Sequence, residues 1–451
     1  MSIPHYQIGL LSNYQICLTM SKFLVLSSAL ILFVSTLFAQ RPIPAPAQTN
    51  SVLILGATAH LGNGQTIANS AIAFEKGKLT LVADATLIRF DRSRFGKIYD
   101  AAGKHVYPGF IAPNTTLGLT EIDALKPTRD FSELGTYTPQ LRTIVAYNTD
   151  SDIIPTVRSN GILMAQVAPD GSGLLGTSSI VQLDAWNWED ATYRADDGVW
   201  MDWPNPRAFS RFGSNGPQFK KSEDYDKQVQ ANKQYFEEAR AYSKQPNPAV
   251  KNLAFEAMRG LFDKTKSLFI LANTAQTIEE AVLFAEGFGV RVVIVGATDS
   301  WLVADFLKEH QVPVILGATQ AIPPREDDDL DQRFKTPAML QEKGVLFALS
   351  DAGSWKQRNL PFQAGQACGY GLSVEQAISA LTLNTAKILG IDDRCGSLEE
   401  GKDATLFISE GDALDMRSCI VTAAFIQGRE INLDNKHKQL ARRFVEKYKQ
   451  N

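Results

Sequence analysis

Histidine and cysteine are scarce in this sequence. Four cysteines occur in 451 residues, and their spacing fits no zinc knuckle. The net charge is −4 and no block of basic residues occurs, which argues against a nucleic-acid-binding protein because such proteins concentrate positive charge on one face. The content of 44% hydrophobic and 21% charged residues is typical of a globular protein and excludes a disordered one. Five histidines are present: His5, His60, His105, His310 and His437.

Near the N-terminus, residues 23–39 form one apolar run between Lys22 and the Pro-rich sequence RPIPAPAQ. A basic flank, a short apolar segment and a small residue, Ala39, predict a signal peptide over residues 1–39, with Met20 as the true start. A membrane anchor is the alternative, but the run is short for a bilayer span. We therefore expect an exported protein, periplasmic or secreted, with no stable membrane insertion after removal of the signal.

Three cysteines remain in the predicted mature chain, Cys368, Cys395 and Cys419. One disulfide between two of them is compatible with an oxidising compartment. The alternative, which we favour, is that all three are small buried hydrophobic residues. The sequence leaves their oxidation state open.

The mature chain divides into two strand-rich ends and a middle that alternates strands with helices. Short strand patterns separated by Gly-containing turns occur in residues 51–105 and again in 395–433, which predicts one β-sandwich made from both ends. Between them, apolar strands followed by amphipathic helices recur every 20–30 residues over 106–394, which predicts an α/β fold with a (β/α)8 TIM-like barrel. Residues 40–50 are a Pro-rich linker.

Two segments depart from this pattern. Residues 186–250 predict an insertion over one barrel face, with a polar helix over about 223–244. Its tryptophans either pack the insertion onto the barrel, which we favour, or stack on a ligand. Residues 434–451 predict a basic amphipathic helix with Leu440, Phe444 and Tyr448 on one face. We expect this helix to dock on the body of the protein, with membrane contact as the alternative.

Four stretches of the mature chain resemble the amidohydrolase superfamily. Residues 103–119, GKHVYPGFIAPNTTLGL, are similar to the entry to the first barrel strand, where a Pro-Gly-Phe/Leu-Ile/Val-Asp segment leads to His-x-His. Residues 380–387 and 396–406 resemble the closing helix and the return to the sandwich. Leu349-Ser350-Asp351 resembles the end of the eighth strand. The similarity runs from about Ser51 to Gly428, and the closing segment is most like imidazolonepropionase-like and related cyclic-amide hydrolases.

The resemblance implies a zinc or other divalent metal held by the His-x-His pair and by one histidine each from strands five and six. In this chain the His-x-His positions hold Asn114 and Thr116, and the runs of strands five and six, which end near Asn273 and Thr298, contain no histidine. Neutral amides and hydroxyls are poor ligands for transition metals, so we predict no metal and no cofactor here. We expect these four side chains to form a polar cup that binds substrate. Asp351 stands where the family has its general base, and a purely structural role is its alternative.

Two other polar stretches have competing interpretations. The acidic run at 326–331 offers oxygen ligands to calcium, but a solvated loop is the favoured interpretation. The Gly/Ser-rich stretch from Pro169 to Ser179 is compatible with a loop that binds an anion through backbone N–H groups, which is a weak signal.

By resemblance, we expect a hydrolase of non-peptide C–N bonds, in a cyclic amide or related compound, that lacks the usual histidine metal site. The alternative is a non-catalytic pseudoenzyme that binds a small polar ligand or a partner subunit. The expected partners are a small polar molecule and either a second copy of the chain or a paralogue with the complete histidine set. A structural envelope protein ranks last. The sequence does not name the substrate.

Overall fold

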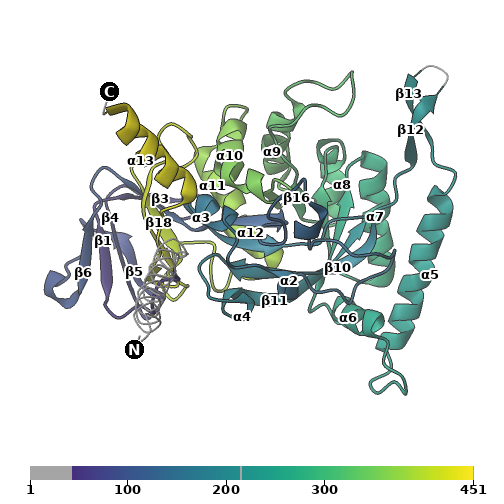
Figure 1. Cartoon of the computed structure of the whole chain (residues 1–451), viewed down its shortest axis with the longest axis horizontal. Helices are drawn as coiled ribbons and strands as arrows, with labels where there is room; N and C mark the ends of the chain where they lie inside the picture. The colour runs from purple at the N-terminus through teal and green to yellow at the C-terminus, as the bar shows by residue number, and fades with distance from the viewer. Residues whose placement is uncertain (1–42, 214–215, 450–451) are drawn as a thin grey trace, which may run out of the picture. The chain divides into compact units, whose positions relative to one another are not determined.

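The computed structural model describes residues 43–213 and 216–449, and the chain from Pro44 onward forms one compact unit. The predicted signal peptide lies outside the described residues. Within the part of the chain that is described, no helix is both long and apolar enough to cross a membrane. The unit combines a β-sandwich with a barrel sheet and its surrounding helices (Figure 1).

The two ends of the chain build the sandwich together. One sheet has the order β5-β4-β1-β6 and the other the order β20-β19-β18-β7-β2-β3. Strand β18 pairs antiparallel with β7, so the C-terminal part joins the N-terminal part as predicted. Ile54, Phe74 and Phe425 lie in the apolar core of the sandwich. The strands are β1 (Val52–Leu55), β2 (Thr58–His60), β3 (Thr66–Ile67), β4 (Ser70–Glu75), β5 (Lys78–Asp84), β6 (Lys97–Asp100), β7 (His105–Pro108), β18 (Leu406–Ser409), β19 (Val421–Ile426) and β20 (Arg429–Glu430).

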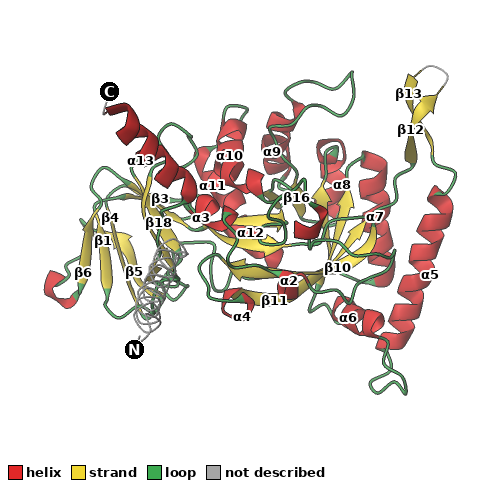
Figure 2. Cartoon of the chain, in the orientation of Figure 1, coloured by secondary structure: helices red, strands yellow, loops and turns green. Residues whose placement is uncertain are grey.

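The middle of the chain forms an eight-stranded sheet that is nearly closed into a barrel (Figure 2), which confirms the predicted α/β TIM-like fold. Among the described residues, no strand hydrogen bonds join the first and last strands. The loop after the last strand connects them instead, since the Gly353 carbonyl accepts from Thr115 Oγ1 at 2.6 Å. The strands are β8 (Phe110–Thr115), β9 (Ile162–Val167), β10 (Gly173–Gln182), β11 (Thr192–Asp202), β14 (Ser267–Ala272), β15 (Val292–Gly296), β16 (Val314–Leu316) and β17 (Phe347–Leu349).

Helices follow most of the barrel strands, as the alternating pattern predicts. Helix α11 begins with a capping box, in which Ser373 accepts from the Gln376 backbone N–H. Helix α7 also begins with a capping box, in which Thr274 is the N-cap and Thr277 is its partner. The helices are α2 (Thr143–Ala146), α3 (Ile153–Arg158), α4 (Trp188–Ala191), α5 (Tyr225–Ser243), α6 (Leu253–Phe262), α7 (Ala275–Phe288), α8 (Ala304–Glu309), α9 (Gln332–Lys343), α10 (Leu360–Cys368), α11 (Val374–Leu381), α12 (Leu383–Leu389) and α13 (Lys436–Lys449), with short 3-10 turns at Arg92–Arg94, Lys126–Thr128, Ser300–Val303 and Trp355–Asn359.

One strand runs against the others. Strand β10 is antiparallel to both β9 and β11, whereas the remaining neighbours in the barrel sheet are parallel. The predicted anion-binding loop from Pro169 to Ser179 is therefore largely strand: Gly173–Ser179 belongs to β10, whose neighbours occupy backbone N–H groups that a loop would leave free. Strand β9 pairs only with residues 179–182 of β10. Beside the first half of β10, isolated parallel bridges from Tyr137 and Arg142 take the place of β9.

Part of the predicted insertion belongs to the barrel. Residues 192–202, inside the expected 186–250, form β11, which pairs with β14 in the barrel sheet. Trp200 is fully buried inside the barrel and stacks on Phe269, with ring centroids 5.0 Å apart. Trp203 is also buried, while Trp186 is 64% exposed. The remainder of this segment consists of the hairpin β12 (Arg207–Gly213) and β13 (Gly216–Lys221), followed by the predicted polar helix, α5.

The C-terminal helix α13 forms where it is predicted but does not dock along its length. It has no buried residue. Its first turn is attached, because the His437 ring packs edge-on against Trp355 at 5.7 Å and His437 Nδ1 lies 3.3 Å from Thr156 Oγ1. The expectation of a docked helix is therefore wrong beyond this turn.

The three cysteines of the described chain, Cys368, Cys395 and Cys419, are free thiols. Cys395 is buried, and the other two are partly buried. Burial raises the pKa of the Cys368 and Cys419 thiols to about 11 and that of Cys395 to about 12. The thiols are therefore protonated at neutral pH and behave as small apolar groups.

Candidate functional site

The first two predicted site residues lie at the end of β8. Asn114 has a left-handed backbone (φ 53°), and its N–H donates to Gln166 Oε1 at 3.4 Å. Thr116 is buried, and its backbone N–H donates to the Gly353 carbonyl at 3.3 Å. Thr116 is thereby held next to the loop that follows β17.

The structure brings the other two cup residues together. Asn273 follows β14 and Thr298 follows β15, and Thr298 Oγ1 donates to Asn273 Oδ1 at 3.1 Å. The approach is close because Gly296, at the end of β15, has φ 84°, and a Cβ there would lie 2.6 Å from Asn273 Oδ1. Near the ends of β14 and β15, strands for which the resemblance implies one histidine each, the chain thus holds a hydrogen-bonded amide–hydroxyl pair.

Asp351 lies two residues beyond β17 and is 6% exposed. Its Oδ2 accepts a hydrogen bond from Gln363 Nε2 on α10, and its backbone carbonyl accepts from Gln357 Nε2. Burial raises the pKa of the carboxyl group above its usual range, while Lys356 and the Gln363 hydrogen bond act in the opposite direction. A buried carboxylate held by one amide is a stronger base than an exposed one.

A second polar group inside the barrel was not identified from the sequence. Ser178 Oγ donates to Asp197 Oδ1 at 2.8 Å, and Gln166 Nε2 donates to Asp197 Oδ2 at 2.7 Å. All three side chains are buried. Burial raises the pKa of Asp197 to about 6, although both hydrogen bonds lower it. Because Gln166 also accepts from the Asn114 backbone, this network reaches the end of β8.

Two further carboxylates lie near the ends of β9 and β11. Asp202 is the last residue of β11, and Asp170 follows β9, where its N–H donates to the Phe131 carbonyl at 3.0 Å. Burial, followed by the charge of Asp170, raises the pKa of Asp202 to about 6. The signal that could have identified Gln166 and Asp202 is a polar side chain within or directly after an apolar strand.

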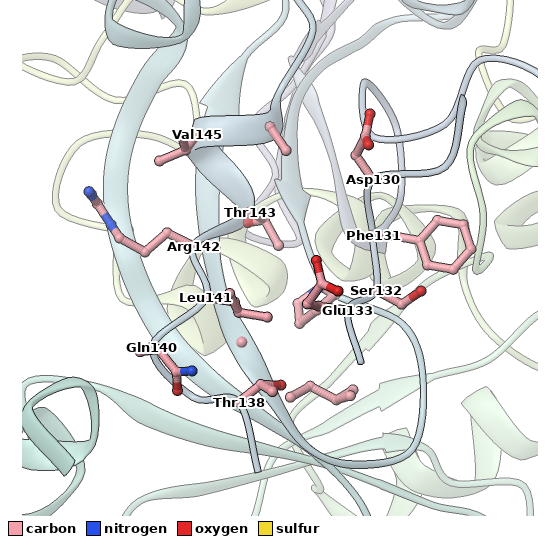
Figure 3. A pocket seen from close by; sticks show the side chains of 14 residues that line it. Asp130, Phe131, Ser132, Glu133, Thr138, Gln140, Leu141, Arg142, Thr143 and Val145 are labelled. Carbon is pink, nitrogen blue, oxygen red and sulfur yellow. The ribbon is translucent and has the colours of Figure 1, made fainter. Parts of the chain in front are cut away.

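Two cavities lie near the strand ends. The larger, of about 470 Å³, lies between the loop that follows β8 and the first half of β10. Figure 3 shows Asp130 and Glu133 on the loop side, while Arg142 extends away from them. The smaller, of about 20 Å³, is lined by Thr298 and Arg333 and has room for one water molecule. Of the five predicted residues, Thr298 lines the smaller cavity, while Asn114, Thr116, Asn273 and Asp351 line neither of the two.

The donors at the predicted positions do not fit the family's metal. Asn114, Thr116, Asn273 and Thr298 offer neutral oxygen and nitrogen atoms, and two of these side chains bond to each other. In residues 43–213 and 216–449, no group of three or more His, Cys, Asp or Glu residues is arranged to hold a metal ion. No chemical step is therefore derived through a metal, and its absence stays a prediction.

The four histidines of the mature chain have other positions. His60 on β2 and His105 on β7 lie in the sandwich, where His60 Nδ1 lies 2.6 Å from Glu375 Oε1 and His60 Nε2 lies 3.0 Å from His105 Nδ1. Burial, followed by the charge of His60, lowers the pKa of His105. His310 follows α8 and lies 2.7 Å from Glu286 Oε1. His437 is on α13.

The acidic run at 326–331 is a loop in which several carboxylates have protein partners. Arg325 contacts Asp328 at 2.7 Å and both oxygens of the buried Asp299 at 2.9 Å. Asp329 pairs with Lys335. The favoured interpretation, a solvated loop, agrees with these contacts better than a calcium site does.

The chain thus combines a barrel that has carboxylates at its strand ends with a sandwich built from both chain ends. Comparison with solved structures agrees. An amidohydrolase from Thermotoga maritima MSB8 superposes with a TM-score of 0.71 and 23% identity, covering 84% of this chain and 99% of that one. A Xaa-Pro dipeptidase and a molinate hydrolase each superpose with a TM-score of 0.52, at 15% and 14% identity, and cover 85% and 87% of this chain and 100% and 96% of theirs. Likeness at these identities concerns the fold.

Sequence comparison links part of the chain to a known family. Residues 290–431, from the start of β15 into the sandwich, match the model of the Amidohydrolase family, in line with the sequence resemblance. An imidazolonepropionase from Syntrophobacter fumaroxidans (strain DSM 10017 / MPOB) is 35% identical over 86 residues, which are 18% of this chain and 20% of that relative. The match thus spans only a fifth of the relative.

Proposed function

We propose that this protein hydrolyses a non-peptide C–N bond in a small polar molecule, a cyclic amide or related compound, with Asp351 as the general base. The observation that carries the proposal is the position of Asp351, buried directly after β17 with one oxygen held by Gln363. Catalytic residues of such barrels lie at the carboxyl ends of strands. The family match also includes this residue.

In the proposed reaction, the Asp351 carboxylate accepts a proton from water as the water oxygen attacks the amide carbonyl carbon. The C–N bond then breaks, and the same proton passes from Asp351 to the leaving nitrogen. Asn114 and Thr116, at the end of β8, position the substrate.

The test is a panel of cyclic amides assayed with the wild-type protein and with Asp351→Asn. We expect turnover by the wild type and a loss of about 100-fold or more in kcat in the variant, because the amide cannot accept the proton. Asp305→Asn, an exposed carboxylate on α8, is the matched control and keeps full activity. Equal turnover by Asp351→Asn and wild type would overturn the mechanism.

The alternative, a non-catalytic protein that binds a small polar ligand or a partner subunit, is favoured by the hydrogen bond between Thr298 and Asn273. In this pair the polar side chains at the ends of β14 and β15 satisfy each other. Ligand binding without turnover, measured by calorimetry on the same panel, supports this alternative.

Export to the periplasm or the medium remains part of the proposal, and the N-terminal sequence of the mature protein tests it.

A further inference from the structure

Helix α13 presents an apolar face that nothing in the described chain covers. At 3.6 residues per turn, Leu440, Phe444 and Tyr448 follow one another on one side of the helix, and Val445 lies beside them. Their exposed fractions are 39% for Leu440, 54% for Phe444, 51% for Val445 and 68% for Tyr448. Along the row from Leu440 to Tyr448, exposure rises toward the C-terminal end of the helix.

The start of the helix is fixed to the body, so the exposed face has a defined place. Asn435 is buried, and its Oδ1 accepts from the Lys438 backbone N–H at 2.9 Å. His437 packs against Trp355. Figure 1 shows α13 running from this attachment to the C-terminus. The first turn is thus anchored, while the later turns leave their apolar side uncovered.

The remainder of the helix surface is strongly basic. The sequence of α13 contains six Lys and Arg residues and one Glu, in a chain whose net charge is −4. Arg442 pairs with Asp434 at 2.8 Å. Among the described residues, no ion pair is formed by Arg443, Lys447 or Lys449. Helices with an apolar aromatic face and a Lys/Arg-rich polar face lie in the interface of membranes that contain anionic lipids.

We propose that α13 binds the surface of an anionic phospholipid bilayer, with its apolar face in the interface and its cations at the lipid head groups. Charge complementarity favours this occupant over a second copy of the helix, because two copies would bring twelve cations together. The helix lies on the bilayer without crossing it, since it is too short and too polar to span one.

The test uses residues 44–451, the compact unit that contains the sandwich and barrel cores, so that the apolar N-terminal segment does not contribute. Co-sedimentation with vesicles of phosphatidylcholine alone or mixed with phosphatidylglycerol measures binding. We expect at least about tenfold tighter binding to the anionic vesicles at low salt, and loss of that preference at high salt.

Variants separate the two faces of the helix. Phe444→Glu with Tyr448→Glu is expected to reduce binding about tenfold or more, whereas Leu283→Glu, at a comparably exposed apolar residue on α7, leaves it unchanged. Arg443→Glu with Lys447→Glu is expected to abolish the anionic preference. Lys233→Glu with Lys251→Glu, which changes the net charge equally, keeps it. All of these residues are solvent-exposed, so the melting temperatures should stay close to wild type.

Any of three results overturns the proposal. The first is that the wild type binds both kinds of vesicle equally, and the second is that Phe444→Glu with Tyr448→Glu binds like the wild type. The third is a concentration-dependent dimer in analytical ultracentrifugation that Phe444→Glu abolishes, which would make a second copy the occupant of the face.

Discussion

Asp197 has both carboxylate oxygens hydrogen-bonded inside the barrel, yet its burial still raises its pKa to about 6. A raised pKa means that the folded state binds the proton more tightly than the unfolded state does. The resulting stabilisation is fully present below the ordinary value of 3.8, is lost as the pH rises through about 6, and is absent above it. A shift of about two units corresponds to about 3 kcal/mol.

The prediction at this residue concerns Asp197→Asn, which keeps an oxygen for Gln166 or Ser178 but does not titrate. Between about pH 4 and about pH 7, the free energy of unfolding of the wild type should fall by up to about 3 kcal/mol relative to the variant. Denaturant unfolding of both proteins across this range measures the difference. Parallel pH profiles would show that Asp197 has an ordinary pKa in the folded protein.

Individual residues also show how far sequence analysis reached. Asp351 could be placed at a strand end because the order of strands and helices determines where β17 stops. The contact between Asn273 and Thr298 agrees with their prediction as neighbours at the ends of adjacent strands. Asp197 could not be found, because its segment has mixed polarity and was assigned to an insertion. Its hydrogen-bond partners come from β9 and β10, 31 and 19 residues away, and that assignment did not pair these strands with its segment.

At the scale of elements, the turn between α3 and β9 depends on one glycine. Gly161 has φ 83°, and a Cβ there would lie 2.5 Å from the Phe407 ring of β18. Gly64 has a similar backbone, φ 90°, with no atom within 4 Å of a Cβ. Substitutions at the two glycines therefore distinguish the cost of backbone strain, which both positions share, from the cost of steric crowding, which only Gly161 adds.

We predict that Gly64→Ala costs about 1–2 kcal/mol of stability, from backbone strain alone. Gly161→Ala should cost about a further 1–3 kcal/mol, because Phe407 must move. Chemical denaturation of both variants and wild type checks this. If the two substitutions cost the same, the contact between Gly161 and Phe407 is not tight in solution.

Most elements were predictable because their apolar patterns are continuous, as in β14 and β15. The reversed β10 was not, because its first half is rich in Gly and Ser and was interpreted as a loop. Its strand structure depends on β11 and on the bridges from Tyr137 and Arg142, and local sequence carries no signal for either.

At the scale of the whole molecule, Asp184 joins the sandwich to the barrel. It is 4% exposed and pairs with Arg158 at the end of α3 and, at 3.1 Å, with Arg429 of β20. Its Oδ2 also accepts from the Ala45 backbone N–H at 2.8 Å. A single carboxylate thus compensates a buried arginine and connects segments from both ends of the chain.

We predict that Asp184→Ala destabilises the protein by about 3–5 kcal/mol, because Arg158 is left buried without a counter-charge. Asp305→Ala, which removes the exposed partner of Lys343, should cost at most about 1 kcal/mol. Calorimetry should show that Asp184→Ala lowers the melting temperature of the whole unit. An effect as small as that of Asp305→Ala would contradict this role.

The reversal of β10 has a consequence for how the chain reaches this fold. A parallel barrel strand pairs with its neighbour only after a long crossover has closed, whereas β9, β10 and β11 follow one another as an antiparallel meander. Contacts between segments that are close in sequence lose less chain entropy when they form, and they form sooner. The meander is therefore the part of the barrel best suited to nucleate it, and the parallel strands β14 to β17 can then add to the edge that β11 presents.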